Sequence, residues 1–531
     1  MMTKENQSLP SRLRIASRKS DLARIQAYTV GQAIMSVAPH LQIEYQFRES
    51  LGDKNLNDPL WKIPEKGVFT QDFHQDLVLD QTDLVVHSWK DLAVEENPET
   101  FVTCTMERED VRDVLFVKKS HFDRIEKSQK LRIYTSSPRR MHHFSSFAKN
   151  YLPFFLEQIE FESVRGNIQT RMRKMLEADQ IDGMLMAKAG LDRLLSAPQP
   201  EFRETQDFFH SALKSLDFMI LPITTNPQAP AQGALAIEIK RSRTDLIQLL
   251  EKINHRPTFS DVIREREILK SYGGGCHSKI GVSHISTQTF QFTLVQGEID
   301  SQDIQRSDFH SGVALEYQKQ FRPDQLFAPH GSDYFDLEHI SEKDWTDRLS
   351  LFLSQSQTPV AIEIAKESYL NKVAPLKNAF IWSSGLETWK KLAQHRIWVH
   401  GSQESFGSLL SRPNHFFGQR VTWGKITHEM ASRYPGYQSG GKGEITSLAS
   451  CRLVEKKEFP DLSQYEAFFW KSGSLFLKAV TEQPSIIKKI HFCGFGETFQ
   501  IISEFFQQNE KTKSVYQFPN EKIWRHYVTK L

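Results

Sequence analysis

Several polar side chains that can do acid–base or anion chemistry follow directly on short apolar runs in the first half of the chain. Lys90 and Asp91 come soon after the run 83–86, and the pair Arg139–Arg140 follows a similar run. A sheltered carboxylate can shuttle a proton or stabilise a cation, and arginine forks bind carboxylates and phosphates. These residue types indicate an anion-binding site beside a reactive carboxylate. The alternative for Asp91 is a helix N-cap.

Arginine is concentrated around the second of these runs. The segment 132–173 holds six arginines, and two of them follow a Ser-Ser-Pro sequence that predicts a helix N-terminus. Free backbone N–H groups and the helix dipole favour anions at such a place. A solvated basic face is the alternative, but the position beyond a strand end favours a ligand. The six are Arg132, Arg139, Arg140, Arg165, Arg171 and Arg173.

Cys276 is a further candidate, because the three glycines before it allow the backbone to turn sharply and expose the thiol. A buried, inert cysteine is the alternative. The four cysteines, at positions 104, 276, 451 and 493, form no Cys-x-x-Cys pair and have no histidine at metal-ligand spacing. We therefore expect neither a disulfide framework nor a metal site.

The elements that must position these residues alternate between short apolar runs and helix-like stretches over the first ~240 residues, which predicts parallel α/β units. The predicted strands lie at 13–16, 83–86, 132–135 and 183–187. In open α/β sheets, ligands bind beyond the carboxyl ends of the strands. Every polar cluster named above follows such an end.

The pattern changes in the second half. A helix-like stretch and alternating strands predict a small α+β domain at 256–330, and the polar, acidic segment 331–358 reads as a linker. The segment 379–410 and the pair of segments 467–480 and 489–505 each read strand, Ser-Gly turn, helix, strand, Gly-containing turn and helix. This faint repeat predicts two similar α/β lobes.

Composition limits the class of protein. The 531 residues predict three or four domains. With 67 Lys and Arg against 65 Asp and Glu, the net charge of +2 gives no global field that would attract nucleic acid. No signal-peptide core and no apolar run near the ~18 residues of a membrane span is visible. We expect a cytoplasmic monomer that binds neither nucleic acid nor membrane.

Ten motifs, in this order along the chain, resemble those of the hydroxymethylbilane synthase (porphobilinogen deaminase) family and cover about residues 12–330. They are RIASRKSDLA (14–23), GD (52–53), KGVF (66–69), VVHSWKDLA (85–93), EREDVRD (107–113), TSSPRR (135–140), VRGNIQTR (164–171), AKAGLDRL (187–194), APAQGALAIE (229–238) and GGGCHSKIG (273–281).

The resemblance implies an α/β fold with two periplasmic-binding-protein-like lobes built on parallel sheets. The first lobe would comprise 12–105 and 213–245, the second 106–212, and the small α+β domain at 256–330 would carry the cofactor. It also implies an enzyme that condenses four porphobilinogen molecules stepwise into hydroxymethylbilane and releases ammonia, in tetrapyrrole (haem) biosynthesis. A non-catalytic, two-lobed binding protein for anionic solutes is the alternative.

The resemblance gives roles to particular residues. Cys276 matches the cysteine that holds a covalent dipyrromethane cofactor, and Asp91 matches the catalytic aspartate, with Lys90 beside it. Residues that match cofactor-binding positions are Ser137, Arg139, Arg140, Arg165 and Arg171. Residues that match substrate-binding positions are Arg18, Ser20, Lys66 and Ser88.

The chain departs from the family pattern at Asp21, Ala93, Tyr134 and Lys279, none of which is a proposed catalytic side chain. Residues 359–531, with their two predicted lobes, resemble uroporphyrinogen-III synthase, which acts on the product of the first enzyme. A fused second enzyme is thus one expectation for this half. A degenerate interaction domain is the other.

Overall fold

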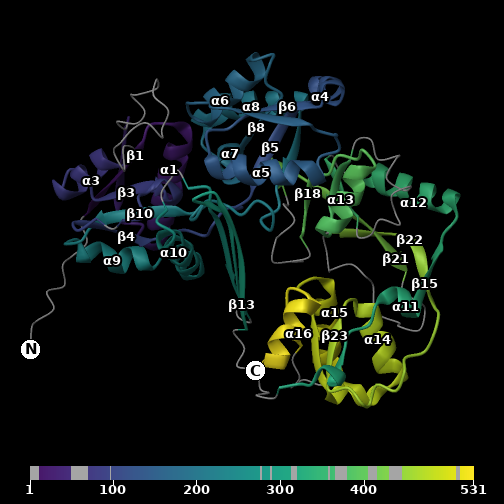
Figure 1. Ribbon diagram of the computed structural model, residues 1–531. Coiled ribbons are helices and arrows are strands. Elements are labelled where there is room, and N and C mark those ends of the chain that lie inside the picture. Colours follow the sequence, from purple (N-terminus) through teal and green to yellow (C-terminus); the bar gives the residue numbers. More distant parts are fainter. Residues whose placement is uncertain are drawn as a thin grey trace, which may run out of the picture. The chain divides into compact units, whose positions relative to one another are not determined.

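The computed structural model divides the chain into two units (Figure 1). The first comprises Met1–Ser286 and Gln291–Phe309, and the second comprises Thr287–Phe290 and His310–Leu531. The structure describes residues 11–49, 70–95, 97–274, 278–287, 290–311, 320–356, 359–364, 379–404, 415–429, 445–509 and 515–530.

The first sheet of the first unit has the strand order β2-β1-β3-β10-β4. Apolar residues point to both of its faces, as expected where helices cover both sides of a parallel sheet. Ile15 and Val86 pack with residues of α1 (Asp21–Val37) and α9 (Thr244–Glu251) on one face, and Val85 packs with α3 (Gln71–Val78) on the other. The strands are β1 (Arg12–Arg18), β2 (Gln42–Arg48), β3 (Leu84–Ser88), β4 (Thr100–Cys104) and β10 (Leu235–Lys240).

The second sheet has the order β7-β6-β8-β5-β9 and the same plan. In both sheets four of the five strands run in the same direction. The remaining strand, β10 in the first sheet and β5 in the second, lies between two of them and runs antiparallel to both. The mixed α/β class with parallel strands is confirmed. The elements are β5 (Asp113–Lys118), α4 (Phe122–Ser128), β6 (Lys130–Tyr134), α5 (Pro138–Tyr151), β7 (Gln158–Glu162), α6 (Ile168–Glu177), β8 (Gly183–Ala187), α7 (Lys188–Ser196), α8 (Arg203–Ser215) and β9 (Leu216–Ile220).

The chain passes between the two sheets twice, after β4 and after β9. We expected residues 213–245 to belong with the first sheet, but β9 pairs with β5 of the second along its whole length. Its apolar residues, including the buried Phe218, complete the edge of that sheet. Only β10 onward therefore returns to the first sheet.

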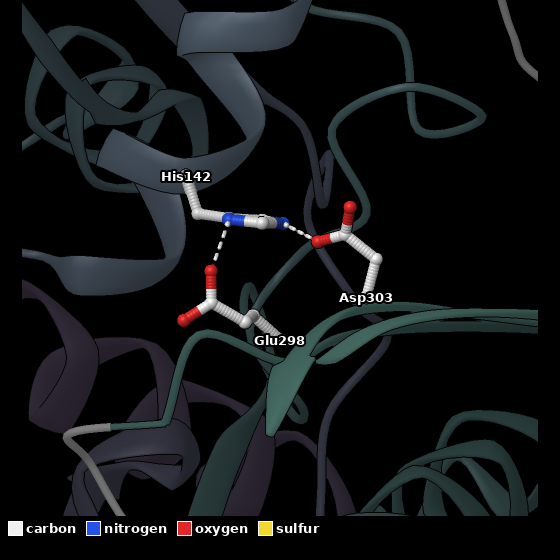
Figure 2. Close-up of side chains that lie close together, drawn as sticks. All are labelled: His142, Glu298 and Asp303. Carbon is white, nitrogen blue, oxygen red and sulfur yellow. Dashed lines mark ion pairs between the residues drawn. The ribbon is translucent and has the colours of Figure 1, made fainter. Parts of the chain in front are cut away.

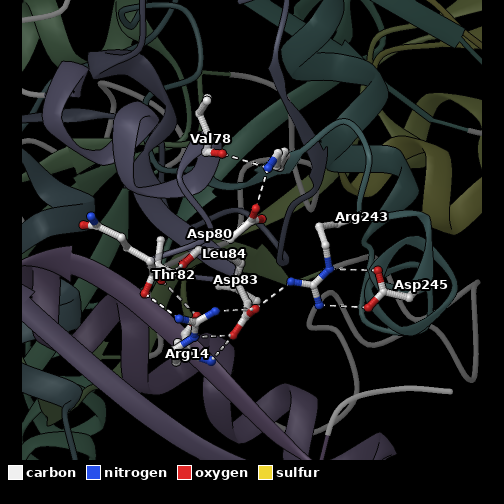
Figure 3. A network of polar contacts seen from close by, with 10 residues as sticks. Arg14, Val78, Asp80, Thr82, Asp83, Leu84, Arg243 and Asp245 are labelled. Atoms are coloured by element: carbon white, nitrogen blue, oxygen red, sulfur yellow. Dashed lines mark hydrogen bonds and ion pairs between the residues drawn. The ribbon is translucent and has the colours of Figure 1, made fainter. Parts of the chain in front are cut away.

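A buried carboxylate fixes the start of β3, the strand that leads to Lys90 and Asp91 (Figure 3). The side chain of Asp83 accepts hydrogen bonds from Arg14 Nε at 3.0 Å and from Arg243 at 2.6 Å, and Arg243 also pairs with Asp245. Burial alone would raise the pKa of Asp83, but hydrogen bonds from Arg14 and Arg243 outweigh it and lower the pKa. The charged carboxylate thus ties β1 and the segment before α9 to β3.

Helix α10 (Arg256–Ser271) and a three-stranded sheet follow. Strand β12 (Phe290–Ile299) is central; β11 (Gly281–Ser286) pairs antiparallel with it on one side, and β13 (Gln302–Ser311) lies on the other. Glu265 of α10 is fully buried and accepts two hydrogen bonds from Arg108, at 2.9 and 2.8 Å. This ion pair fixes the helix against the first crossing between the sheets.

The second unit contains two larger sheets. The six-stranded sheet comprises β15 (Phe335–His339), β22 (Ile445–Glu455), β21 (Thr422–Glu429), β16 (Val360–Ile364), β17 (Phe380–Ser383) and β18 (Gly401–Ser402). The four-stranded sheet comprises β14 (Leu326–Phe327), β23 (Ala467–Trp470), β24 (Ile490–Cys493) and β25 (Tyr516–Gln517). The remaining elements are α11 (Gly331–Tyr334), α12 (Glu342–Gln355), α13 (Leu386–Gln394), β19 (His415–Phe416), β20 (Gln419–Arg420), α14 (Gly473–Glu482), α15 (Glu497–Asn509) and α16 (Glu521–Lys530).

The repeated sequence pattern corresponds to repeated structure. The strands β17 and β18 are parallel and flank α13, and β23 and β24 are parallel and flank α14. The predicted linker 331–358 is instead part of the fold: β15 pairs with β22 and α12 buries Trp345, because the apolar residues of this segment are spaced to face a core. Strand β14 likewise pairs with β23 of the second unit. The small α+β domain that we expected at 256–330 therefore ends before β14.

Within the described part of the chain, no helix is both long enough and apolar enough to cross a membrane.

Candidate active site

Predicted site residues from both sheets of the first unit line one cleft of about 640 Å³. Strands β1, β3 and β8 end at this cleft, as the position of ligand sites beyond parallel strands predicts. Eight of its lining side chains are Arg or Lys and two are Asp, so the cleft is strongly cationic. The predicted residues that line it are Arg18, Ser20, Ser88, Lys90, Asp91, Arg140, Arg165 and Arg171.

Helix starts help to position the cationic side chains of the second sheet. Ser137 is the N-cap of α5, and its hydroxyl oxygen accepts a hydrogen bond from the backbone N–H of Arg140. Asn167 caps α6 in the same way. Before it, Gly166 has φ +115°, a conformation that favours glycine, and its carbonyl accepts the Nε–H of Arg171 at 2.7 Å. The predicted helix N-terminus after the Ser-Ser-Pro sequence is thus confirmed.

Asp113, which sequence reasoning missed, is the anchor of the arginine pair. It is the first residue of β5, is almost fully buried, and accepts hydrogen bonds from Arg139 at 2.7 Å and from Arg140 Nε at 3.0 Å. Burial would raise the pKa of Asp113, but the two guanidinium groups hold it well below its usual range. Its only sequence signal is its place at the end of the EREDVRD motif.

Two predicted ligand-binding residues do not line the cleft. Arg139 is buried and donates both to Asp113 and, at 2.7 Å, to the carbonyl of Pro227, so its guanidinium forms hydrogen bonds inside the protein and not in the cleft. Ser137 contributes the helix cap described above. The reason is geometric: adjacent residues in the first turn of a helix point about 100° apart, so Arg140 reaches the cleft and Arg139 does not.

Lys90 is held at the edge of the cleft by Gln232, a buried residue of the second crossing. The Gln232 side-chain oxygen accepts from Lys90 Nζ at 3.3 Å, and its amide nitrogen donates to Asp113 at 2.9 Å. Burial lowers the pKa of Lys90 to about 8, although the neighbouring Asp91 raises it. Lys90 is therefore a cation that loses its charge only a little above neutral pH.

This shift predicts a pH dependence of substrate affinity. Below about pH 8 the Lys90 ammonium is charged and can bind a carboxylate; as the pH rises above that value the charge is lost. We expect KM to rise at alkaline pH, and the Lys90→Arg variant, whose guanidinium stays charged, to lack this rise. Separate profiles of KM and kcat from pH 6 to 10 measure it. Lys19→Arg is the control, because Lys19 is paired with Glu49 at the cleft surface.

Asp91 closes a single turn of 3-10 helix, Trp89–Asp91, directly after β3. The carboxylate is exposed to the cleft, whereas Trp89 on the same turn is buried. Burial, together with the charge of Arg140, lowers the pKa of Arg171 to about 10, and Asp91 acts in the opposite direction. The only other cleft carboxylate, among the described residues, is Asp21, which accepts a hydrogen bond from Thr205 at 2.6 Å.

Two predicted residues, Lys66 and Cys276, lie outside the described residues. Sequence reasoning also passed over cationic residues that line the cleft, although two of them stand inside quoted motifs. These additional residues are Lys19, Lys174 and Arg193.

A histidine with two carboxylates lies away from this cleft (Figure 2). His142 of α5 faces Glu298 through Nδ1 and Asp303 through Nε2, each at 3.8 Å, and Lys279 pairs with Glu298. One ring nitrogen of His142 and one oxygen of each carboxylate lie within 4.8 Å of one another. The arrangement is suited to an ion-pair bridge between α5 and the β12–β13 hairpin.

The first unit is thus a mixed α/β protein with a cleft, lined by residues from both sheets, whose cationic side chains suit a small polyanionic molecule. Residues 13–248 match the sequence model of the porphobilinogen deaminase dipyromethane cofactor binding domain. The porphobilinogen deaminase of Syntrophomonas wolfei is 34% identical over 264 residues, which are 50% of this chain and 78% of that protein. That of Synechococcus elongatus is 32% identical, over 56% of this chain and 87% of the relative. The chain therefore belongs to the porphobilinogen deaminase family.

Solved structures to which the chain is similar include the VFT2 domain of BvgS from Bordetella pertussis, with a TM-score of 0.27, 12% identity and coverage of 49% of this chain and 92% of that one. The periplasmic aliphatic sulphonate binding protein SsuA from Escherichia coli gives a TM-score of 0.26 and 13% identity, and covers 50% and 76% of the two chains.

Proposed function

We propose that the first unit is a hydroxymethylbilane synthase, which condenses four porphobilinogen molecules and releases ammonia at each step. The observation that carries this proposal is the exposed carboxylate of Asp91 in a cleft that eight Arg and Lys side chains also line. Each porphobilinogen carries two carboxylates, and its reaction passes through a cation. Binding the carboxylates requires cationic side chains, and stabilising the cation requires a nearby anion, so the reaction needs both in one cleft.

The residues of the cleft fit a dipyrromethane. Its four carboxylates require several cationic partners, and Arg140, Arg165 and Arg171 project from the second sheet's loops and helices into the cleft. When bound, the group supplies the pyrrole carbon to which new units are added. In this proposal Cys276 holds it through a thioether bond. The domain matched by the family is the cofactor-binding domain, and it ends at residue 248, before this cysteine.

The first sheet supplies the reacting side of the cleft. Arg18, Ser20 and Ser88, which line the cleft, would hold the carboxylates of the incoming porphobilinogen. The family resemblance gives the same role to Lys66, which lies outside the described residues. Asp91 would accept a hydrogen bond from the pyrrole N–H and stabilise the positive charge that develops as ammonia leaves. Lys90, whose lowered pKa leaves it able to give up a proton near pH 8, would orient a carboxylate or protonate the departing amine.

The test is turnover by the full chain. We expect ammonia and hydroxymethylbilane to form from porphobilinogen in a ratio of four to one. A protein that binds porphobilinogen in this cleft and releases it unchanged would instead be a solute-binding protein, the alternative that the fold class leaves open.

We further propose that the second unit is a uroporphyrinogen-III synthase-like enzyme that closes the linear product into a ring. Its two lobes of similar strand–helix–strand structure support this. So does a polar cluster that joins them: Lys425 Nζ lies 3.3 Å from the buried Glu363 of one lobe and pairs with Glu497 of the other. Comparing ring-closed isomers formed by the full chain and by a chain ending at residue 319 tests this. Identical isomer ratios would leave an interaction domain as its role.

A further inference from the structure

The guanidinium group of Arg266, on α10, holds the turn that carries Asp91. One of its terminal nitrogens donates to the carbonyl oxygens of Trp89 at 3.4 Å and of Leu92 at 3.2 Å, and the other donates to the carbonyl of Ala93. These carbonyls flank Asp91 on both sides. The contact joins segments 173–177 residues apart in the chain.

Apolar packing brings the turn and the helix together without fixing the orientation of the carboxylate. Trp89 and Leu92 belong to one buried cluster with Val262 of α10, and the ring of Trp89 lies 5.2 Å from that of Phe259. Such contacts are non-directional. Hydrogen bonds to three carbonyls are directional, so Arg266 determines how the short 3-10 turn sits on the helix.

The helix is itself anchored by the residue next to Arg266. Glu265 is fully buried and accepts hydrogen bonds from Arg108, from Gln228 Nε2 at 2.9 Å and from the backbone N–H of Ala231 at 2.8 Å. Arg108 also donates to the carbonyl of Gln232, whose side chain holds Lys90. The hydrogen bonds that fix α10 next to Arg266 therefore belong to the same network that positions Lys90.

We propose that Arg266 is a positioning residue for the condensation reaction: it holds the Asp91 carboxylate at its working place in the cleft through the backbone of residues 89–93. This inference rests on the proposed function.

The test is steady-state kinetics of full-length Arg266→Gln, with kcat expressed per protein molecule that carries the dipyrromethane mass. A displacement of a catalytic group by about 1 Å costs on the order of 100-fold in rate. We expect kcat to fall 10- to 100-fold and KM for porphobilinogen to stay within about threefold, because the carboxylate-binding side chains are untouched. A purely structural residue would lower the unfolding temperature and leave kcat per loaded molecule unchanged.

Arg264→Gln is the matched control. Arg264 lies on the same helix, is exposed, and pairs with Glu267, so its loss removes the same charge without touching the turn. Arg266→Lys, which keeps the charge but places all donors on one nitrogen, should give an intermediate kcat. It also serves as the test variant if Arg266→Gln does not fold.

Asp91→Ala separates the two proposals. An inactive Asp91→Ala beside a fully active Arg266→Gln would overturn the positioning role and leave the proposed function intact. Full activity of Asp91→Ala would overturn the positioning role, because Arg266 would then have no catalytic group to position, whereas the proposed function would be overturned only if the unaltered protein did not turn over porphobilinogen.

Discussion

Asp91→Ala is expected to lower kcat for porphobilinogen by about 10²–10⁴-fold, the range typical of losing a positioned acid–base group. The carboxylate is the one exposed anion, among the described residues, that faces a cleft lined by cations. Removing it leaves the cation formed on ammonia loss surrounded by arginines, which would destabilise the transition state. KM should change little or fall, because a negative charge is removed from a site that binds carboxylates.

The control for this prediction is Asp21→Ala. Asp21 also lines the cleft, but its carboxylate accepts from Thr205 and lies 3.6 Å from Arg24. We expect its removal to change kcat by less than tenfold. Thermal unfolding of both variants checks that each is folded. Comparable kcat values for Asp91→Ala and the unaltered protein would remove Asp91 from the mechanism.

Cys276→Ser is expected to abolish turnover and to remove a mass excess equal to two linked pyrroles. A serine hydroxyl is a far weaker nucleophile than a thiol, so the thioether would not form. Without the covalent primer, the cleft cations would lack the group onto which new pyrroles are added. Intact mass of both proteins, purified from cells that synthesise porphobilinogen, measures this directly.

The other cysteines supply the control. Cys104, Cys451 and Cys493 are buried, and burial raises the pKa of the Cys104 and Cys493 thiols well above the usual range, which makes them poor nucleophiles. Cys493→Ala should therefore retain the mass excess. An excess that survives in Cys276→Ser would place the attachment at another residue, and no excess in either protein would indicate an inactive relative.

The cleft was largely predictable from local sequence. Apolar runs followed by polar clusters mark the ends of buried strands, and parallel strands bring such ends to one edge of a sheet. Arg18, Lys90 and Arg140 could therefore be assigned to one site from the sequence alone, and all three line the cleft. The family could be predicted in the same way, since its motifs are short and contiguous. The repeat in the second half likewise predicted two strand–helix–strand segments.

Contacts between residues distant in the sequence determined the features that local sequence did not predict. The guanidinium groups of Arg139 and Arg140 are held by Asp113, which lies 26 and 27 residues earlier on β5, and Arg139 also donates to the carbonyl of Pro227, 88 residues later. The linker prediction failed because β15 finds its partner β22 more than a hundred residues later. The hydrogen bonds of Arg266 to the turn that carries Asp91 also join residues distant in the sequence. Local sequence determines which residues can end a strand or begin a helix, because that depends on neighbouring side chains. Only the tertiary structure determines which side chain is buried in the interior and which lines the cleft, because the residues that bind these side chains are distant in the sequence.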